Sequence, residues 1–193
     1  MRTEINIGGS ASDYDSRRGR GDLINGYIET SSSGDFVRIR KSPGLKEFAN
    51  VGNGPIRGMF SIKDRLFVAS GNELYLITNN SETLLGDIGG NTELVNFAAN
   101  GTDDNQIIII SNKKGYIYDE TLGFRLITDP DFDPDYSVAS LNQIFWVNKA
   151  SSNEFQGSDV ANGDSWPALR FGSAEQSPGP IQYVAQKRSA LWF

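Results

Sequence analysis

Four short apolar segments recur along the chain at similar intervals. They are RLFVAS from Arg65, QIIIIS from Gln106, QIFWVN from Gln143 and SALWF from Ser189, so their starts are 41, 37 and 46 residues apart. Each segment is rich in β-branched or aromatic residues and is bounded by turn-forming residues, which is the pattern of a buried β-strand. A repeat of this kind restricts the fold to architectures in which one supersecondary unit is copied along the chain.

Each apolar segment has strand-like neighbours in the same order. The preceding segments are IRGMFSI, ELVNFAAN, YSVASL and PIQYVAQ. The first three units continue with ELYLIT, GYIYDE and NEFQGS, and then with TLLGDI, FRLITD and ALRFGS. Four strands joined by turns such as SGN, NNS and NKKG form an antiparallel meander, and a period of about 40 to 50 residues makes each meander a propeller blade. The sequence predicts an all-β fold, a β-propeller of four-stranded antiparallel blades, with a β-sandwich as the alternative.

The first 54 residues do not fit the repeat. The segment GGSASDYDSRRGRGD is rich in Gly, Ser and charged residues, which is typical of an extended arm. LINGYIE and DFVRIRKSPGL predict two short strands on either side of TSSSG, and FVRIR is a candidate for the strand that closes the propeller ring. We expect an N-terminal arm over residues 1–54 and a propeller over residues 55–193. Because SALWF would leave an unpaired apolar edge, we also expect the chain to be truncated within a fourth blade.

The composition excludes several classes of function. The chain has no Cys and no His, so it lacks disulfides, thiol chemistry, the commonest metal ligand and the commonest general base. No segment approaches the roughly 20 apolar residues of a membrane helix, and the N-terminus lacks the pattern of a secretion signal. We therefore expect no membrane association, and assembly in the cytoplasm of the cell that makes the protein.

Charge is unevenly distributed along the chain. Residues 51–193 contain 10 Lys or Arg and 17 Asp or Glu, which gives a net charge of −7. Such an acidic body argues against direct binding to a nucleic-acid backbone, because that binding depends on Lys and Arg. Protein partners are favoured. The run RRGRGD, from Arg17 to Asp22, is interpreted as a solvated tail, with docking into an acidic groove as the second alternative and DNA contact as the third.

The segment DVANGDSW resembles the Asp-box turn of sialidases, Ser-x-Asp-x-Gly-x-Thr-Trp. Gly163, Ser165 and Trp166 match this pattern, but Ala161 stands where the pattern requires Asp. Even a complete Asp box is structural and lies away from the catalytic centre of a sialidase. We therefore interpret Trp166 as an aromatic plug over a blade edge, preceded by a turn at Asn162 and Gly163.

The segment DPDFDPD places carboxylates at alternate positions, which raises the question of calcium. The four residues are Asp129, Asp131, Asp133 and Asp135. An EF-hand loop that begins at Asp129 would need Gly at its sixth position and Glu at its twelfth, where the chain has Pro134 and Ser140. The segment is interpreted as a solvated acidic connection between the second and third blades.

Other charged residues give no pattern of a catalytic site. A glycosidase would need two carboxylates across a cleft, and nothing in the spacing of Glu82, Glu154 and Glu175 pairs them. Arginines recur near the predicted strands and are interpreted as surface or inter-blade ion pairs; they are Arg57, Arg65, Arg125, Arg170 and Arg188. The Gly-rich segments lack the Lys-Ser/Thr context of a phosphate loop. We predict no catalytic residue, no cofactor and no metal.

Four parts of the chain together resemble the packaged-DNA stabilisation proteins, or tail accessory factors, of short-tailed bacteriophages. NGYIE followed by VRIRKSPGL is similar to the opening of that family, and IRGMFSIKDRLFVASGNELYLI is similar to its first blade. LNQIFWVN with FQGSDVANGDSWPALRFGSAEQSPGPI resembles its Phe-x-x-Ser, Ser-Trp and Phe-x-x-Ala-Glu-x-x-Pro elements. IQYVAQKRSALWF resembles the next blade. The resemblance covers residues 25–193.

The resemblance implies a virion protein of the phage tail without enzymatic activity. Such proteins form a homo-oligomeric ring beneath the portal and the head-to-tail adaptor, and they help to retain the packaged DNA. A tail needle or plug and the tailspikes attach to the same region. The alternative from another class is a carbohydrate-active or carbohydrate-binding propeller that reads glycans in its central pocket.

Overall fold

The computed structural model describes residues 25–30, 37–79, 81–90, 92–101, 106–175 and 179–193. Every regular element in these residues is a β-strand, and none is a helix that could span a membrane. The chain divides into two compact units, residues 1–48 and residues 49–193. The segment before Asn25, including RRGRGD, lies outside the described residues.

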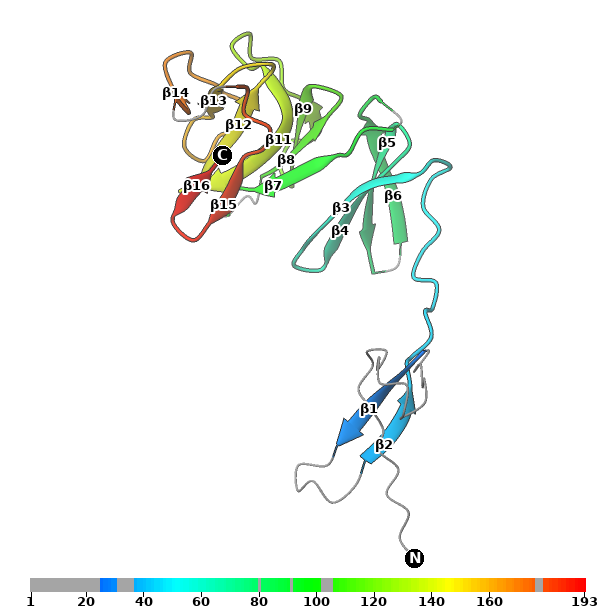
Figure 1. Cartoon of the computed structure of the whole chain (residues 1–193). Coiled ribbons are helices and arrows are strands. Elements are labelled where there is room, and N and C mark those ends of the chain that lie inside the picture. The colour runs from blue at the N-terminus through cyan, green and yellow to red at the C-terminus, as the bar shows by residue number, and fades with distance from the viewer. Residues whose placement is uncertain (1–24, 31–36, 80, 91, 102–105, 176–178) are drawn as a thin grey trace, which may run out of the picture. The chain divides into compact units, whose positions relative to one another are not determined.

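The second unit consists of successive antiparallel sheets (Figure 1). Blade 1 contains β3 (Ile56–Ile62), β4 (Arg65–Ser70), β5 (Glu73–Thr78) and β6 (Ser81–Asp87). Blade 2 contains β7 (Asn96–Ala99), β8 (Ile107–Ser111), β9 (Lys114–Asp119) and β10 (Gly123–Leu126). Blade 3 contains β11 (Pro134–Leu141), β12 (Ile144–Lys149), β13 (Glu154–Gly157) and β14 (Phe171–Ser173). A two-stranded sheet follows, formed by β15 (Ala185–Lys187) and β16 (Ala190–Trp192).

The predicted strand repeat is confirmed. The four apolar segments form β4, β8, β12 and β16, each of which is the second strand of its sheet. The strands within each blade pair in sequence order, as a meander requires. Two tight turns show why the register is regular. Asn112 and Lys113 have φ values of 51° and 57°, and Asn142 and Gln143 have values of 55° and 63°, which is the left-handed pair of residues that suits a two-residue hairpin.

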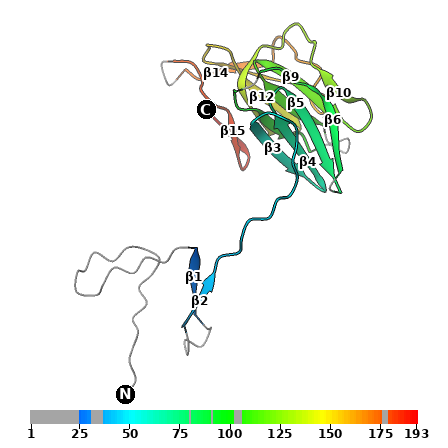
Figure 2. The ribbon, with the colours of Figure 1, turned by 90° about the vertical axis from the view of Figure 1, so that its right-hand side faces the viewer.

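Strand β8 has apolar side chains at four successive positions, Ile107 to Ile110, and its packing explains why. Ile107 and Ile109 belong to the apolar cluster shared with blade 1, whereas Ile108 and Ile110 belong to the cluster shared with blade 3. All four side chains are buried. Successive side chains of a strand point to opposite faces of the sheet, so blade 2 is covered on both faces. Figure 2 shows the blades lying face to face.

The face of blade 1 that points away from blade 2 has its own small cluster. Val68 and Ile77 pack there with Val51, and Leu66 and Tyr75 lie at its border. Val51 precedes β3, so the chain that enters the propeller also covers part of this face.

The described part of the first unit is a hairpin of β1 (Gly26–Thr30) and β2 (Val37–Lys41). Both strands that were predicted on either side of TSSSG are therefore present. The segment FVRIR, considered as a ring-closing strand, contributes β2, and one edge of β2 is occupied by β1.

A buried arginine links blades 1 and 2. Arg57 of β3 is 3% exposed. Its Nε donates to the carbonyl of Glu93 at 2.7 Å, and its Nη1 donates to the carbonyls of Gly71 at 2.6 Å and Gly89 at 2.8 Å. Its Nη2 donates to Ser111 Oγ of blade 2 at 2.9 Å. The planar guanidinium satisfies four acceptors from separate segments, which a single ammonium group does not match in geometry.

We predict that Arg57→Lys destabilises the fold although it keeps the charge. Lysine leaves several of these acceptors unsatisfied, so the free energy of unfolding should fall by about 3 kcal/mol. Urea denaturation of the variant and the unchanged protein measures this difference. Arg188→Lys is the matched control, because Arg188 is exposed, and it should change the free energy by less than about 0.5 kcal/mol. Equal midpoints for the two variants would contradict the role assigned to Arg57.

Candidate functional site

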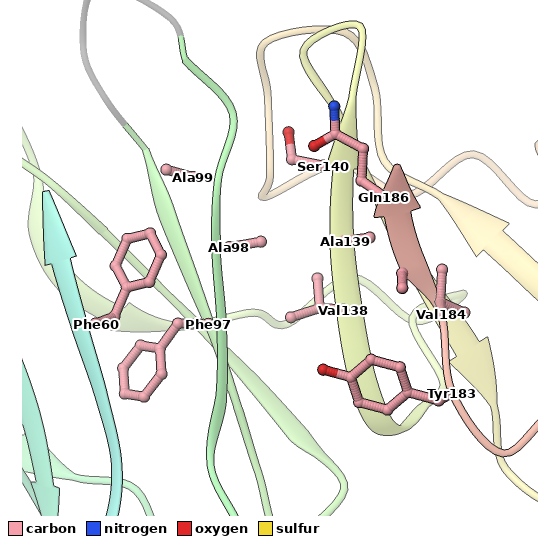
Figure 3. A pocket seen from close by; sticks show the side chains of 11 residues that line it. Phe60, Phe97, Ala98, Ala99, Val138, Ala139, Ser140, Tyr183, Val184 and Gln186 are labelled. Atoms are coloured by element: carbon pink, nitrogen blue, oxygen red, sulfur yellow. The ribbon is translucent and has the colours of Figure 1, made fainter. Parts of the chain in front are cut away.

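The first strands of the sheets in the second unit line an open pocket of about 370 Å³. Its wall is formed by Phe60 of β3, residues 97–99 of β7, residues 138–140 of β11 and residues 183–186 at the start of β15 (Figure 3). Phe60 and Phe97 stack at a centroid distance of 5.9 Å. The innermost strands of propeller blades line a central channel, and this pocket lies against the first strands of the blades.

The wall of the pocket is aromatic, aliphatic and small. It contains no Asp, Glu, Lys or Arg among its described residues. Its ionisable group is the Tyr183 hydroxyl, which donates to Asn96 Oδ1 at 3.4 Å, while Asn96 Nδ2 donates to the Tyr136 carbonyl at 2.7 Å. Such a wall supplies contact surface and a few hydrogen bonds. Most glycosidases use a pair of carboxylates, and the described residues that line this pocket include no Asp or Glu.

The three glutamates considered as glycosidase carboxylates lie on other strands. Glu82 is exposed on β6, the outermost strand of blade 1. Glu154 of β13 forms an ion pair with Lys149 at 2.9 Å, and Glu175 accepts a hydrogen bond from Ser173 beyond β14. The structure therefore does not bring them together at this pocket.

The acidic segment between blades 2 and 3 is only partly solvated, which corrects the interpretation from sequence. Asp131 and Asp133 are exposed. Asp129, however, accepts hydrogen bonds from the backbone N–H groups of Asp131 at 2.9 Å and Trp166 at 2.8 Å, and Asp135 pairs with Lys113 at 3.2 Å. Among the described residues there is no group of three or more acidic side chains that could hold a metal ion.

Trp166 lies inside the molecule rather than over a blade edge, which is a second correction. Its side chain is 1% exposed. It belongs to the cluster that joins Ile117 of blade 2 to Phe145 of blade 3, and its ring lies 4.5 Å from that of Phe132. The long connection between β13 and β14 thus inserts its tryptophan between two blades. The expected turn before Trp166 is present, and the indole Nε1 donates to the Gly163 carbonyl at 2.9 Å.

The Asp-box pattern braces its turn with one Asp, and this chain has Ala161 at that position. Two other aspartates hold the turn here. Asp159 Oδ2 accepts from Ser165 Oγ at 2.8 Å, and Asp129 holds the Trp166 N–H from the preceding connection. Gly163 is required by close packing, because a Cβ there would lie 2.5 Å from the side chain of Ile117. The role of Asp159 could have been predicted because it lies within the motif. Nothing in the sequence around Asp129 indicates that it contacts Trp166.

Three of the five recurring arginines link neighbouring blades, as their interpretation as inter-blade pairs predicts. Besides Arg57, Arg65 of blade 1 pairs with Glu120 of blade 2 at 2.8 Å. Arg125 of blade 2 pairs with Asp164 of the β13–β14 connection. The other two differ, since Arg170 bonds within blade 3 to Ser158 and Asp159, and Arg188 is exposed in the β15–β16 turn.

The Arg125 contact also perturbs a buried carboxylate. Burial of Asp119 acts to raise its pKa, but the carboxylate accepts hydrogen bonds from the N–H groups of Leu122 at 2.6 Å and Thr121 at 3.0 Å and pairs with Arg125 at 2.7 Å. These interactions stabilise the ionised form, and the pKa of Asp119 lies below its ordinary value.

Consecutive four-stranded meanders, stacked face to face around a channel, define a β-propeller. The family described as "Bacteriophage P22 Gp10, beta-propeller" matches residues 29–193, so the chain belongs to this family of phage stabilisation proteins. The resemblance inferred from sequence is confirmed, and the fold that it implies agrees with the structure. A comparison with curated proteins finds no match.

We predict that Asp119 contributes to acid sensitivity. Its pKa is lower in the folded chain than the value of about 3.9 in an unfolded chain, so its stabilisation is present above that value and is lost as the pH falls through the folded pKa. Asp119→Asn should therefore flatten the decrease in unfolding free energy below about pH 4. Urea denaturation across the acid range, at constant ionic strength, measures the slope. Asp133→Asn, at an exposed position, is the control, and equal slopes for both variants would refute the prediction.

We predict that Trp166→Ala opens a cavity between blades 2 and 3. The free energy of unfolding should fall by about 3–5 kcal/mol, the usual range for a buried tryptophan. Trp192→Ala is the matched control, because Trp192 is 57% exposed, and its loss should stay below about 1 kcal/mol. Denaturation followed by circular dichroism compares them, and similar losses would show that Trp166 is not an inter-blade anchor.

Proposed function

We propose that the chain is a non-catalytic structural protein of the phage tail that binds beneath the portal and the head-to-tail adaptor. Bound there, it closes the channel through which the genome entered and so retains the packaged DNA. The observation that carries this proposal is the family match over residues 29–193, which covers the hairpin strand β2 and all the described blades.

The charge of the propeller supports a steric mechanism of retention. Residues 51–193 carry a net charge of −7, so the body repels the phosphate backbone rather than holding it through ion pairs. A closure that does not adhere to DNA blocks its exit and does not delay it once the channel opens. The uncharged wall of the open pocket is in keeping with a role in protein contacts rather than in catalysis.

The proposed assembly is a ring of several copies formed in the host cytoplasm. The same ring would provide the attachment region for the tail needle or plug and for the tailspikes. A propeller suits this role because inter-blade packing makes it rigid, while the outer strands and connections remain available for partners.

We predict that a phage that lacks this protein packages its genome and then loses it. Particles from the deletion mutant should contain less DNA than normal particles and should expose it to added nuclease. Addition of the purified full chain to freshly packaged particles should restore protection, since closure requires no chemical step. Protection in the deletion mutant equal to that of normal particles would refute the proposal.

Electron microscopy separates binding from retention. The full chain mixed with the portal–adaptor complex of the same phage should add a ring of density below the adaptor. Failure to bind, combined with hydrolysis of a fluorogenic glycoside panel, would instead favour the carbohydrate-active alternative.

A further inference from the structure

The chain contains four Asn-Gly pairs, which is the dipeptide with the most reactive side-chain amide. They begin at Asn25, Asn53, Asn100 and Asn162. The backbone nitrogen of the following residue can attack the carbon of the asparagine amide, and glycine hinders this attack least because it has no side chain. The attack needs an exposed amide, an asparagine whose backbone is not fixed by hydrogen bonds, and a glycine N–H without an acceptor. The structure distinguishes the four pairs by these requirements.

Two of the pairs are held by the same glutamine. Gln106 Oε1 accepts a hydrogen bond from the Gly163 N–H at 2.9 Å, so the nitrogen that would attack Asn162 is engaged. The Asn162 side chain is also fixed, because its Oδ1 accepts from the Asp164 N–H at 3.1 Å. Asn100 is 4% exposed, and its Nδ2 donates to Gln106 Oε1 at 3.3 Å. The folded chain therefore protects both pairs.

The pair at the start of the hairpin has a fixed backbone. The Asn25 carbonyl accepts a hydrogen bond from the Ser42 N–H at 2.8 Å. Gly26 is the first residue of β1 and lies opposite Lys41 in the ladder. Rotation of the Asn25 backbone toward the geometry of attack would break this end of the ladder.

The pair Asn53-Gly54 meets all three requirements. Both residues are exposed, and they precede β3 in a stretch that forms no strand. Among the described residues, none accepts a hydrogen bond from the Gly54 N–H, and none forms a hydrogen bond with the backbone or side chain of Asn53. The attacking nitrogen and the amide are therefore both free.

The chain on either side of Asn53 is anchored to blade 1. Val51 is buried on the face of blade 1 that points away from blade 2. The Gly54 carbonyl accepts a hydrogen bond from Ser70 Oγ at 3.1 Å. The backbone between Val51 and Gly54 has to span these two anchors, so a change in its length would displace one of them.

We propose that Asn53 deamidates spontaneously in the folded protein and that the product loosens the segment that covers blade 1. The Gly54 nitrogen loses its proton and bonds to Asn53 Cγ, while the side-chain NH2 group takes up a proton and leaves as ammonia. Water then opens the resulting succinimide ring at one of its two carbonyls, which gives aspartate or isoaspartate. In isoaspartate the chain runs through the side-chain methylene, so the backbone between Val51 and Gly54 is one carbon longer. This inference concerns the chemistry of the chain and does not depend on the proposed function.

Peptide mass spectrometry of the aged protein tests the site. The full chain is incubated at neutral pH, and the conversion of Asn53 and Asn162 is followed in the same samples, with isoaspartate detected by enzymatic methylation. We expect Asn53 to convert at least about tenfold faster, because Asn162 reacts only after a local opening breaks the bond to Gln106. The rate should rise with pH, since the attacking nitrogen must lose its proton. The chain unfolded in urea is the matched control, and there the two pairs should convert at similar rates.

A variant tests the effect on the fold. Asn53→Gln should resist conversion, because its longer side chain closes a ring less readily, and the exposed position should leave the stability of the fresh protein unchanged. After ageing, the unchanged protein should contain a population that unfolds at lower urea concentration, and the variant should not.

Three results would overturn the inference. Equal conversion of Asn53 and Asn162 in the folded chain would show that the site is not selected. A tenfold preference for Asn53 that persists in urea would assign the selectivity to the local sequence instead of the fold. Conversion of Asn53 without a change in the urea midpoint would show that the segment over blade 1 is not loosened. None of these results bears on the proposed function, which the nuclease and electron microscopy experiments test.

Discussion

The packing of apolar strand faces between successive sheets is the interaction on which this structure depends. Backbone ladders run within each blade, so neighbouring blades are held together mainly by side chains. Strand β8 shows the constraint most clearly, because its isoleucines alternate between the cluster with blade 1 and the cluster with blade 3. A blade without both neighbours would expose one of these faces to water, at a cost of about 25 cal/mol for each Å² of apolar surface.

Buried polar links add direction to this packing. Apolar contact alone is non-directional, and it would tolerate small shifts between sheets. At the junction of blades 1 and 2, Arg57 joins several segments; at the next junction, Gln106 Oε1 accepts from the Gly163 N–H at 2.9 Å. At the third, Asn148 Nδ2 donates to the Ile181 carbonyl at 3.0 Å. Because an unsatisfied buried polar group is costly, each link favours one register between neighbouring sheets.

The repeat and the turns could be predicted from sequence because both are local. Alternating apolar and polar residues, short apolar runs and turn residues such as Asn112 each depend on only a few neighbouring positions. They are sufficient to predict the strands. The contacts between neighbouring blades could not be predicted in the same way. The burial of Trp166 could not be predicted, because its backbone N–H donates to Asp129 and its side chain shares a cluster with Ile117, and both residues are more than 35 positions away. The sequence predicted that recurring arginines form surface or inter-blade ion pairs. It could not predict the acceptors of Arg57, because they belong to loops that meet only in the folded chain.

The order of the blades also determines how the protein folds as it is synthesised. Each sheet is a contiguous stretch of chain whose strands pair with their sequence neighbours, so its hydrogen bonds can form as soon as that stretch leaves the ribosome. Its second apolar face, in contrast, is buried only when the following sheet has formed. The isoleucines of β8, for example, need Phe145 of β12. The growing chain therefore carries an uncovered sheet face on the blade that has formed most recently. Because transiently exposed apolar surface promotes aggregation, we expect nascent chains of this protein to be most prone to it during those intervals.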